Sequence, residues 1–317
     1  MRKLILAIAM LVAAGAAHAQ GYPTKPVRII VPFAPGGATD LITRIVAQKL
    51  SDNLKQQFFV ENRGGAGGLV GSEVAAKSAP DGYTLVMGTS GTHAINFSLY
   101  DKPLYDPVKD FKALTRVAVL PSMILMHPSV PAKNLRELIA YAKANPGKLA
   151  YASAGNLLYL SGALFTSMAG IDMLHVPFKG AGPQISAIMN NDVQIAITPV
   201  FSALPAVKSG KVKVLAVTSA QRMSAVPEYP TVAESGLPGY EAVSWYGLFT
   251  TAGTPADVVS RLNVELRKIL ALPEIKEALA TQGAEPVIDT PEEFAAIVRA
   301  DVEKWAQIVK QTGAKAD

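Results

Sequence analysis

The residues best placed to do chemistry form the segment VPFAPGGATD, from Val31 to Asp40. An apolar run ends there in a Pro-Gly-Gly turn, and a helical pattern begins at once, near Thr39. Gly36 and Gly37 carry no Cβ, so the backbone can approach a bound group closely. The first N–H groups of a helix lack partners within the helix and favour an anion. The segment therefore predicts a site where main-chain amides hold an anionic group.

Four further segments repeat this arrangement of strand, small or polar residues and helix. They are GTSGTHAIN (88–96), YASAGNLLYLSG (151–162), HVPFKGAGP (175–183) and ITPV (197–200). Ordinary helix capping would also explain the Ser and Thr residues of the first of these. In open α/β sheets, however, ligands bind beyond the carboxyl ends of the strands, where all five segments are expected. Two fall in one predicted domain and three in the other, which predicts a cleft with donors on both walls.

The elements that position these segments are short β-branched runs alternating with helical patterns, which predicts an α/β fold. Strands are expected at 27–33, 58–61, 84–87, 115–120, 123–126, 149–152, 173–176, 194–198, 212–218 and 242–250. Helices are expected at 41–50, 69–77, 94–99, 135–144, 157–169, 184–190, 202–208, 255–270, 274–281 and 291–310.

The domain organisation follows from the last helices, which lack enough strands to form an α/β domain of their own. The chain is therefore expected to return to its first domain near residue 250. This predicts one discontinuous domain, 20–120 with 250–317, and a second domain, 121–249. Two crossing strands, near 115–123 and 242–250, would join them and permit hinge motion.

The amino terminus has the pattern of a secretory signal peptide. Arg2 and Lys3 precede an apolar run over residues 4–17, and Ala17 and Ala19 fit a small-x-small cleavage site. The run is shorter than the roughly 20 residues that a membrane-spanning helix needs. We therefore expect cleavage after Ala19 and export to a bacterial periplasm, with no membrane-embedded part.

Composition excludes several classes of protein. The chain contains no cysteine, which rules out disulfides, thiolate metal sites, a cysteine nucleophile and a lipid-modified cysteine. The formal charge falls from +5 to +3 when Arg2 and Lys3 leave, and the remaining basic residues are scattered. Nucleic-acid binding needs a concentrated basic face, so it is not expected. A monomer without metal or cofactor is predicted.

Motifs for enzymes fit poorly. The glycine cluster RGGAGGLVG (63–71) departs from the dinucleotide fingerprint, because Val70 stands where the third glycine belongs. The segment around Ser153 resembles a nucleophile elbow, but Tyr151 replaces its first glycine. An exported serine hydrolase that uses Ser90 or Ser153 stays open as an alternative function.

Histidines and aromatic residues allow two interpretations each. The three histidines beyond the signal segment have no carboxylate partner by spacing, which favours a structural or ligand-binding role over that of a general base: His93, His127 and His175. Five aromatic residues fall at loops or on the expected crossing strand, namely Phe33, Tyr159, Phe178, Trp245 and Tyr246. They either pack in the core or form apolar walls of a ligand pocket.

An ordered set of motifs resembles the Bug family, the periplasmic substrate-binding receptors of tripartite tricarboxylate transporters. The motifs are VPFAPGGATD, VENRGGAGG, GTSGTHAIN, YASAGN with LSG, HVPFKG and SALPAVKSGKVKVLAVTS. The resemblance covers essentially the whole chain after the signal segment. It implies a periplasmic-binding-protein fold of type II, whose two α/β domains close on a small carboxylate. It also implies a receptor, not an enzyme, that delivers its ligand to transporter membrane subunits.

The same resemblance implies which residues line the ligand site: Phe33, Gly37, Ala38, Thr39, Ser90, Gly91, Thr92, His93, Ser153, Ala154, Gly155, Lys179 and Gly180. Tyr159 and Thr198, which lie in the third and fifth segments, and Trp245, on the expected crossing strand, join this predicted site. Family members tend to hold carboxylates by helix-end amides, hydroxyls and waters, and no arginine lies in the segments carried over.

One departure from the family pattern concerns the ligand. Many relatives have Phe-Asp-Asn where this chain has Ile197, Thr198 and Pro199. The missing carboxylate would pair with a ligand amine. We therefore hypothesise that the ligand is a dicarboxylate or an aromatic acid and not an amino acid. A ligand-sensing partner of a membrane signalling protein is a further alternative, since such a role uses the same cleft.

Overall fold

The computed structural model describes residues 21–314, so the predicted signal peptide lies outside the described residues. Strands within this part form two sheets. The first has the order β11 (Glu285–Pro286), β4 (Phe111–Leu120), β10 (Ser244–Thr251), β3 (Thr84–Thr89), β1 (Val27–Val31) and β2 (Phe58–Asn62). The second has the order β7 (Leu174–Pro177), β6 (Ala150–Ser153), β8 (Ile195–Pro199), β5 (Ser122–Met126) and β9 (Lys213–Val217). We call each sheet with its helices the first and the second unit.

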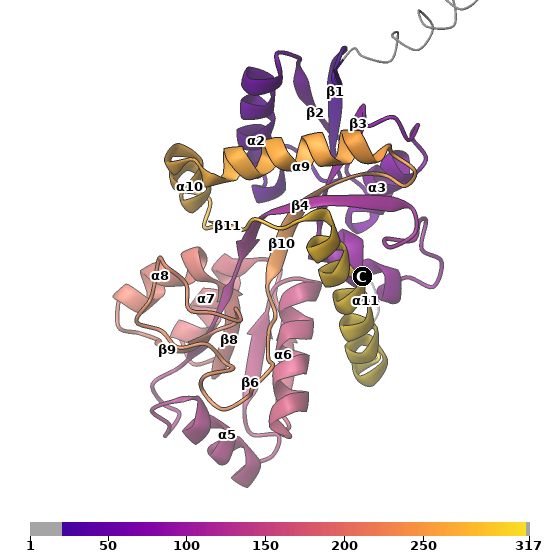
Figure 1. The fold of residues 1–317 in the computed structure, drawn as a ribbon. Coiled ribbons are helices and arrows are strands. Elements are labelled where there is room, and N and C mark those ends of the chain that lie inside the picture. Colours follow the sequence, from indigo (N-terminus) through magenta and orange to yellow (C-terminus); the bar gives the residue numbers. More distant parts are fainter. Residues whose placement is uncertain (1–20, 315–317) are drawn as a thin grey trace, which may run out of the picture.

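Helices cover both faces of each sheet (Figure 1). In the first unit they are α2 (Ala38–Leu54), η1 (Ala66–Gly68), α3 (Leu69–Ala76), η2 (Gly91–Ile95), α4 (Asn96–Leu99), α9 (Ala256–Ala271), α10 (Pro273–Ala280) and α11 (Pro291–Thr312). In the second unit they are α5 (Leu135–Ala144), α6 (Asn156–Ala169), α7 (Ala181–Met189) and α8 (Val200–Lys208). The expected α/β fold is confirmed.

Strand β1 shows how the alternation of side chains builds two packed layers. It pairs in parallel with β2 and β3. Ile29 packs in the cluster that contains Ile42 of α2, whereas Ile30 packs in the cluster that contains Leu69 of α3. Successive strand residues point to opposite faces, so an all-apolar strand such as β1 must be covered on both sides.

Helix ends follow local capping rules where the sequence supplies them. The Thr290 side chain accepts a hydrogen bond from Glu293 N, and the Glu293 side chain accepts one from Thr290 N. Asn134 caps α5 in the same manner, by accepting from Glu137 N. By contrast, α2, α6 and α7 begin at glycine N-caps that form no side-chain cap hydrogen bond.

The chain passes between the sheets twice. Strand β4 ends at Leu120 and β5 begins at Ser122, with Pro121 between them. On the return, Ala242 N still donates to Thr218 O of the second unit, and Ser244 already pairs with Leu120. The predicted division into 20–120 with 250–317 and 121–249 stays a prediction.

One hydrophobic cluster spans both units. It contains Ala94 of η2, Leu160 and Leu164 of α6, and Trp245 and Trp305 from β10 and α11. Helix α11 contacts β4 and η2 of the first unit and α6 of the second. In Figure 1 this helix runs down from the first sheet beside α6. The two units therefore share packing in addition to the two chain passages.

Candidate functional site

The first predicted segment forms an open turn at the end of β1. Gly37 is the N-cap of α2 and has extended backbone dihedrals, φ −81° and ψ 168°. A Cβ built on Gly37 would meet nothing within 4 Å. The amides at the start of α2 therefore border open space, as binding an anion requires.

Asp40 fixes this turn from within. Its Oδ2 accepts a hydrogen bond from Gly36 N at 2.9 Å, and its Oδ1 accepts from Asn62 Nδ2 at 3.0 Å. Arg44 Nε donates to both oxygens, at 3.0 and 3.1 Å. Burial opposes the charge, but these hydrogen bonds together hold the pKa of Asp40 below its usual value. Asp40 is thus a positioning group for the turn, with both oxygens already occupied.

The second predicted segment, after β3, contains hydroxyls that serve two different purposes. Thr89 N donates to Thr92 Oγ1 at 2.9 Å, and Thr92 N donates to Thr89 Oγ1 at 3.1 Å, which closes the turn. Ser90 is 1% exposed, and its Oγ has no hydrogen-bond partner among the described residues. Ser90 Oγ and His93 Nε2 are therefore the buried side-chain atoms of this segment that have no hydrogen-bond partner among the described residues.

His93 lies inside the first unit. Its ring stacks on Phe249 with centroids 4.3 Å apart and packs on Phe111 at 4.5 Å. Complete burial lowers the pKa of His93 to about 3, so the ring is neutral near pH 7. Its Nδ1 lies 2.9 Å from Thr92 Oγ1. His93 thus supports the second segment from the core.

The glycine cluster 63–71 brings the first two segments together. A Cβ on Gly68 would lie 2.5 Å from Thr92 Cγ2 and 3.1 Å from Phe33 Cζ. Gly68 also has a φ of +92°, a conformation that favours glycine. These contacts place Phe33, from the first segment, beside Thr92, from the second. The cluster is a packing element, in agreement with its poor match to a dinucleotide fingerprint.

The third and fourth segments meet at neighbouring strands of the second sheet. Ser153, the last residue of β6, lies 2.8 Å from His175 Nε2 through its Oγ. Tyr159 of α6 stacks on the His175 ring with centroids 4.3 Å apart. Burial lowers the pKa of His175. Within the described residues no carboxylate bonds to His175, so the pair lacks the orienting acid of a hydrolase triad.

Two glycines open the helices that follow these strands. Gly155 is the N-cap of α6 with φ +91°, and Gly180 is the N-cap of α7 with φ +118°. A Cβ on either would meet nothing within 4 Å. Lys179 is exposed beside Gly180, and Ala154 is half-buried beside Gly155. The starts of α6 and α7 thus border open space in the same way as the start of α2.

The fifth segment ends β8 with a second unused hydroxyl. Thr198 is fully buried, and its Oγ1 has no hydrogen-bond partner among the described residues. Its neighbour Pro199 leads directly into α8, whose first amide, Val200 N, donates to Pro121 O. Thr198 therefore repeats, in the second unit, the situation of Ser90 in the first.

The predicted residues fall into two groups. Most lie at the carboxyl ends of β1, β3, β6, β7 and β8 or in the helical turns that follow: Phe33, Gly37, Ala38, Thr39, Ser90, Gly91, Thr92, Ser153, Ala154, Gly155, Tyr159, Lys179, Gly180 and Thr198. Across the units, η2 contacts α6. His93 and Trp245 lie in the core. The Trp245 indole donates to Asp301 Oδ2 at 2.7 Å and packs edge-on against Phe294.

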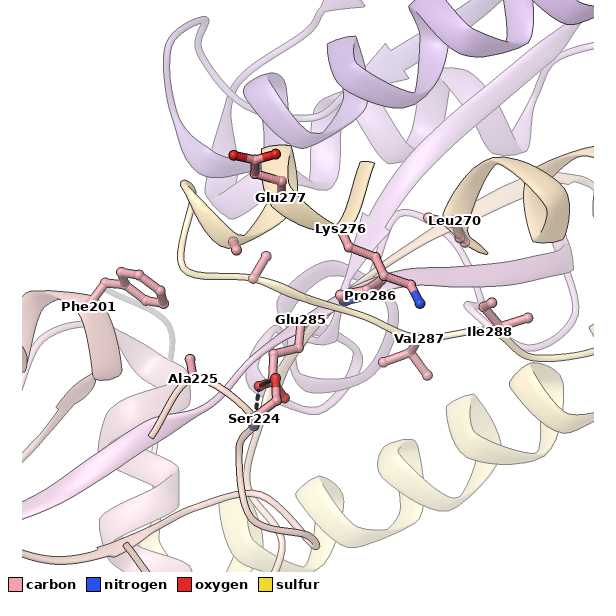
Figure 2. A pocket seen from close by; sticks show the side chains of 12 residues that line it. Phe201, Ser224, Ala225, Leu270, Lys276, Glu277, Glu285, Pro286, Val287 and Ile288 are labelled. Carbon is pink, nitrogen blue, oxygen red and sulfur yellow. Dashed lines mark hydrogen bonds between the residues drawn. The ribbon is translucent and has the colours of Figure 1, made fainter. Parts of the chain in front are cut away.

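A separate cavity of about 740 Å³ lies between the units beside β11 (Figure 2). Phe201 and Ser224 line it from the second unit, and Lys276 and Glu285 line it from the first. Ser224 N and Oγ donate to Glu285 Oε1 at 2.8 and 2.9 Å. No predicted site residue lines this cavity. We place the candidate site at the strand ends, because the open helix starts and unused hydroxyls lie there.

Sequence reasoning missed several residues that shape the site. Asp40 and Asn62 lie 22 positions apart and meet only through the pairing of β1 with β2. The spacing of residues indicates no partner for His175, because Ser153 contacts it from the neighbouring parallel strand. The glycine cluster did carry a signal, since so many glycines beside a helix start indicate close packing.

Comparison with known proteins decides the family. A family model described as "Tripartite tricarboxylate transporter family receptor" matches residues 42–314. The chain belongs to this family. It is 34% identical to protein BugT of Bordetella pertussis over 99% of both chains. The expected membership among the Bug receptors, which are binding proteins and not enzymes, is confirmed.

Solved structures of similar proteins carry ligands. A structure titled "R. palustris Rpa4515 with adipate" has 34% identity and a TM-score of 0.73, over 93% of this chain and 99% of that one. MatC from Rhodopseudomonas palustris, with bound malate, has 32% identity and a TM-score of 0.69, over 91% and 100%. The periplasmic-binding-protein fold expected for this receptor family is confirmed.

Residues 21–314 contain no group of three or more His, Asp or Glu side chains arranged to hold a metal ion. No helix in the same range has the length and apolar character needed to cross a membrane.

Proposed function

We propose that this tripartite tricarboxylate transporter receptor binds a small organic carboxylate and delivers it to the membrane subunits of its transporter. The ligand is a dicarboxylate or an aromatic acid in preference to an amino acid. The receptor acts as a monomer in the periplasm, after cleavage of its signal peptide following Ala19. Family membership and the ligands in the two neighbouring structures support this proposal.

The observation that carries the proposal is that two buried hydroxyls at strand ends, Ser90 Oγ and Thr198 Oγ1, have no hydrogen-bond partner among the described residues. They follow or end strands of different sheets, at ends where helices begin. A buried hydroxyl without a partner costs roughly 1–3 kcal/mol, so such groups are normally satisfied by water or ligand. Strand β3 pairs with β1, which Gly37 follows, and β8 pairs with β6, which Gly155 follows. The two hydroxyls therefore fit a polar ligand or ordered water at these strand ends.

The groups at these strand ends suit a carboxylate. Main-chain amides at the helix starts beside Gly37, Gly155 and Gly180 would donate hydrogen bonds to the carboxylate. The dipole of each helix would stabilise the negative charge by a further ~0.3–1 kcal/mol. Charge-assisted hydrogen bonds contribute roughly 1.5–3 kcal/mol each. A few of these interactions reach the ~8 kcal/mol of a micromolar complex after ordering costs.

Selection against amino acids rests on which carboxylates are available. Asp40 is the acid in the first segment, and its oxygens already accept from Gly36 N, Asn62 and Arg44. At the fifth segment Thr198 supplies a hydroxyl, which is a weak substitute for a carboxylate as partner of an ammonium group. A ligand amine would therefore lose its hydration without a charged partner.

The residues take different parts in the proposed site. Phe33 and Tyr159 form apolar walls, whereas Ala38, Thr39, Gly91, Thr92, Ala154 and Lys179 complete the turns that present the donors. His93 and Trp245 support the site from the core.

Isothermal titration with matched pairs tests this function. The two members of each pair, glutarate with glutamate and succinate with aspartate, differ only by the amino group. Benzoate and adipate are added as further acids without an amino group. We expect micromolar binding to at least one of the acids without an amino group. Tighter binding of the amino acid in each pair would refute the selectivity, and no binding to any carboxylate would refute the proposed function.

A further inference from the structure

Three buried hydroxyls lie at or directly after the carboxyl ends of β3, β6 and β8, and one of them differs from the others. Ser90 Oγ and Thr198 Oγ1 have no partner among the described residues. Ser153 Oγ, by contrast, is already bonded to His175 Nε2 at 2.8 Å. A serine hydroxyl has one hydrogen to donate, so the direction of this bond decides what Ser153 can offer a ligand.

The imidazole of His175 is held in a fixed place. In the parallel pairing of β6 and β7, Tyr151 lies opposite His175, two residues before Ser153 and on the same face of the sheet. The ring packs on Tyr151 with centroids 5.0 Å apart and stacks on Tyr159 at 4.3 Å. Two aromatic contacts thus keep Nε2 directed at Ser153.

We propose that His175 is a positioning residue that makes Ser153 a hydrogen-bond donor to the ligand carboxylate. This inference rests on the proposed carboxylate-binding function. A carboxylate only accepts hydrogen bonds, so Ser153 must direct its O–H at the ligand. Its lone pair then accepts the hydrogen of His175 Nε2. The bound complex therefore contains the His175 tautomer that is protonated on Nε2.

The alternative direction gives a different binding site. If His175 carried its hydrogen on Nδ1, Ser153 would donate to Nε2 and present only lone pairs. Lone pairs facing a carboxylate repel it. Burial lowers the pKa of His175 and so favours the neutral ring. The neutral ring carries one N–H, either on Nδ1 or on Nε2. The choice of tautomer thus separates acceptor ligands from donor ligands at this position.

Two amide substitutions separate the hydrogen bond from other effects. In His175→Gln the side-chain nitrogen reaches the place of Nε2 and can donate to Ser153. In His175→Asn it reaches only the place of Nδ1, so the donor is lost while the polarity is kept. With adipate as the probe, we expect His175→Gln to keep the affinity within about threefold and His175→Asn to lose about tenfold or more. Ser153→Ala should lose as much as His175→Asn, and the double variant little more.

Nuclear magnetic resonance gives a test without substitutions. Long-range ¹H–¹⁵N spectra of the wild-type protein distinguish the two neutral tautomers of His175. We expect the Nε2–H tautomer in the adipate complex, and the Nδ1–H tautomer there would overturn the inference. Equal affinities of wild type, His175→Asn and Ser153→Ala would also overturn it, as would an equal loss in His175→Asn and His175→Gln.

These outcomes are distinct from a failure of the proposed function. If the wild-type protein binds no carboxylate in the panel, the function itself is refuted and the role of His175 falls with it. If the wild type binds adipate but has the same affinity as His175→Asn and Ser153→Ala, or if His175→Asn and His175→Gln lose equally, only the role of His175 is refuted. Circular dichroism melting of each variant verifies that the proteins compared are folded.

Discussion

At the scale of single residues, Asp40 shows how a buried charge shapes a turn. Its carboxylate accepts from a main-chain amide of the turn, from Arg44 on its own helix and from Asn62 on the neighbouring strand. One group thus ties together the turn, the start of α2 and the end of β2. The charge is tolerated because every donor around it is directed at its two oxygens.

We expect Asp40→Asn to lower the free energy of unfolding by about 1–2 kcal/mol at pH 7. Hydrogen bonds hold the pKa of Asp40 below its ordinary value of 3.8, so its charge stabilises the fold above that value. The stabilisation is lost as pH falls through the pKa of the folded protein. The difference between variant and wild type should therefore shrink below pH 3.8.

Urea denaturation at pH 7 and near pH 3 measures both effects. Asp52→Asn is a suitable control, because Asp52 is an exposed acid on the same helix. A stability difference for Asp40→Asn that is the same at both pH values would contradict the assigned role of its charge.

Gly37 gives a prediction about binding that does not depend on stability. Its φ of −81° suits any L-residue, and a Cβ there meets nothing within 4 Å. Gly37→Val should therefore fold with a cost below about 1 kcal/mol, yet place methyl groups where the carboxylate approaches the α2 amides. We expect adipate binding to be lost in calorimetry.

Gly21→Val is the matched control, because Gly21 also has open space around its Cβ position but precedes the amino end of β1, whereas Gly37 follows its carboxyl end. It should bind adipate as the wild type does. A folded Gly37→Val protein with unchanged affinity would exclude the start of α2 from the site.

At the scale of elements, a buried ion pair fixes the segment before α11 to strand β4. Arg116 Nε and Nη2 donate to the two oxygens of Asp289 at 2.7 and 3.0 Å. Asn263 of α9 donates to the Asp289 carbonyl, and Asp289 N donates to Thr115 Oγ1. The start of the last helix is thereby set by partners from β4 and α9.

Arg116→Met should lower the free energy of unfolding by roughly 3 kcal/mol, because it leaves a buried carboxylate without its partner. Arg222→Met removes an ion pair to Glu234 whose side chains are about half exposed, so it should cost under ~1 kcal/mol. Chemical denaturation of the two variants gives the comparison. Equal losses of unfolding free energy in the two variants would show that burial of the ion pair does not affect its contribution to stability.

The elements themselves were largely predictable, because glycine and proline mark where strands end and helices begin. The predicted helix 69–77 corresponds to α3, Leu69–Ala76, and the predicted strand 123–126 to β5, Ser122–Met126. The two-residue strand β11 and the first four residues of β4 were not predicted. Both pair with distant parts of the chain, and no local sequence pattern predicts such pairing.

Side-chain directions could not be predicted in the same way. Trp245 and Tyr246 are adjacent on β10, so they point to opposite faces of the sheet. The sequence does not indicate which face of the strand is directed at the ligand. In the structure the Trp245 indole donates a hydrogen bond to Asp301 of α11. His93 lies in the core for a similar reason, since its place depends on Phe249, more than 150 residues later.

At the scale of the whole molecule, two chain passages and a shared hydrophobic cluster connect the units. A double connection allows rotation about the passages and resists sliding. We expect saturating adipate to reduce the radius of gyration measured by small-angle X-ray scattering, because donors from both units must reach one ligand. Gly37→Val should show no such change at the same concentration. An unchanged radius in wild-type protein that binds adipate would argue against closure.

The order of strands in the first sheet also governs when this protein can fold. Strand β10, Ser244–Thr251, occupies a central place between β3 and β4, although synthesis delivers it more than 120 residues after them. Until those residues emerge, β3 and β4 lack the neighbour that pairs with both. Sequence-distant pairing of this kind slows folding. A newly made chain consequently lacks a complete first sheet until Thr251 has been synthesised, which would favour the export to the periplasm that we propose.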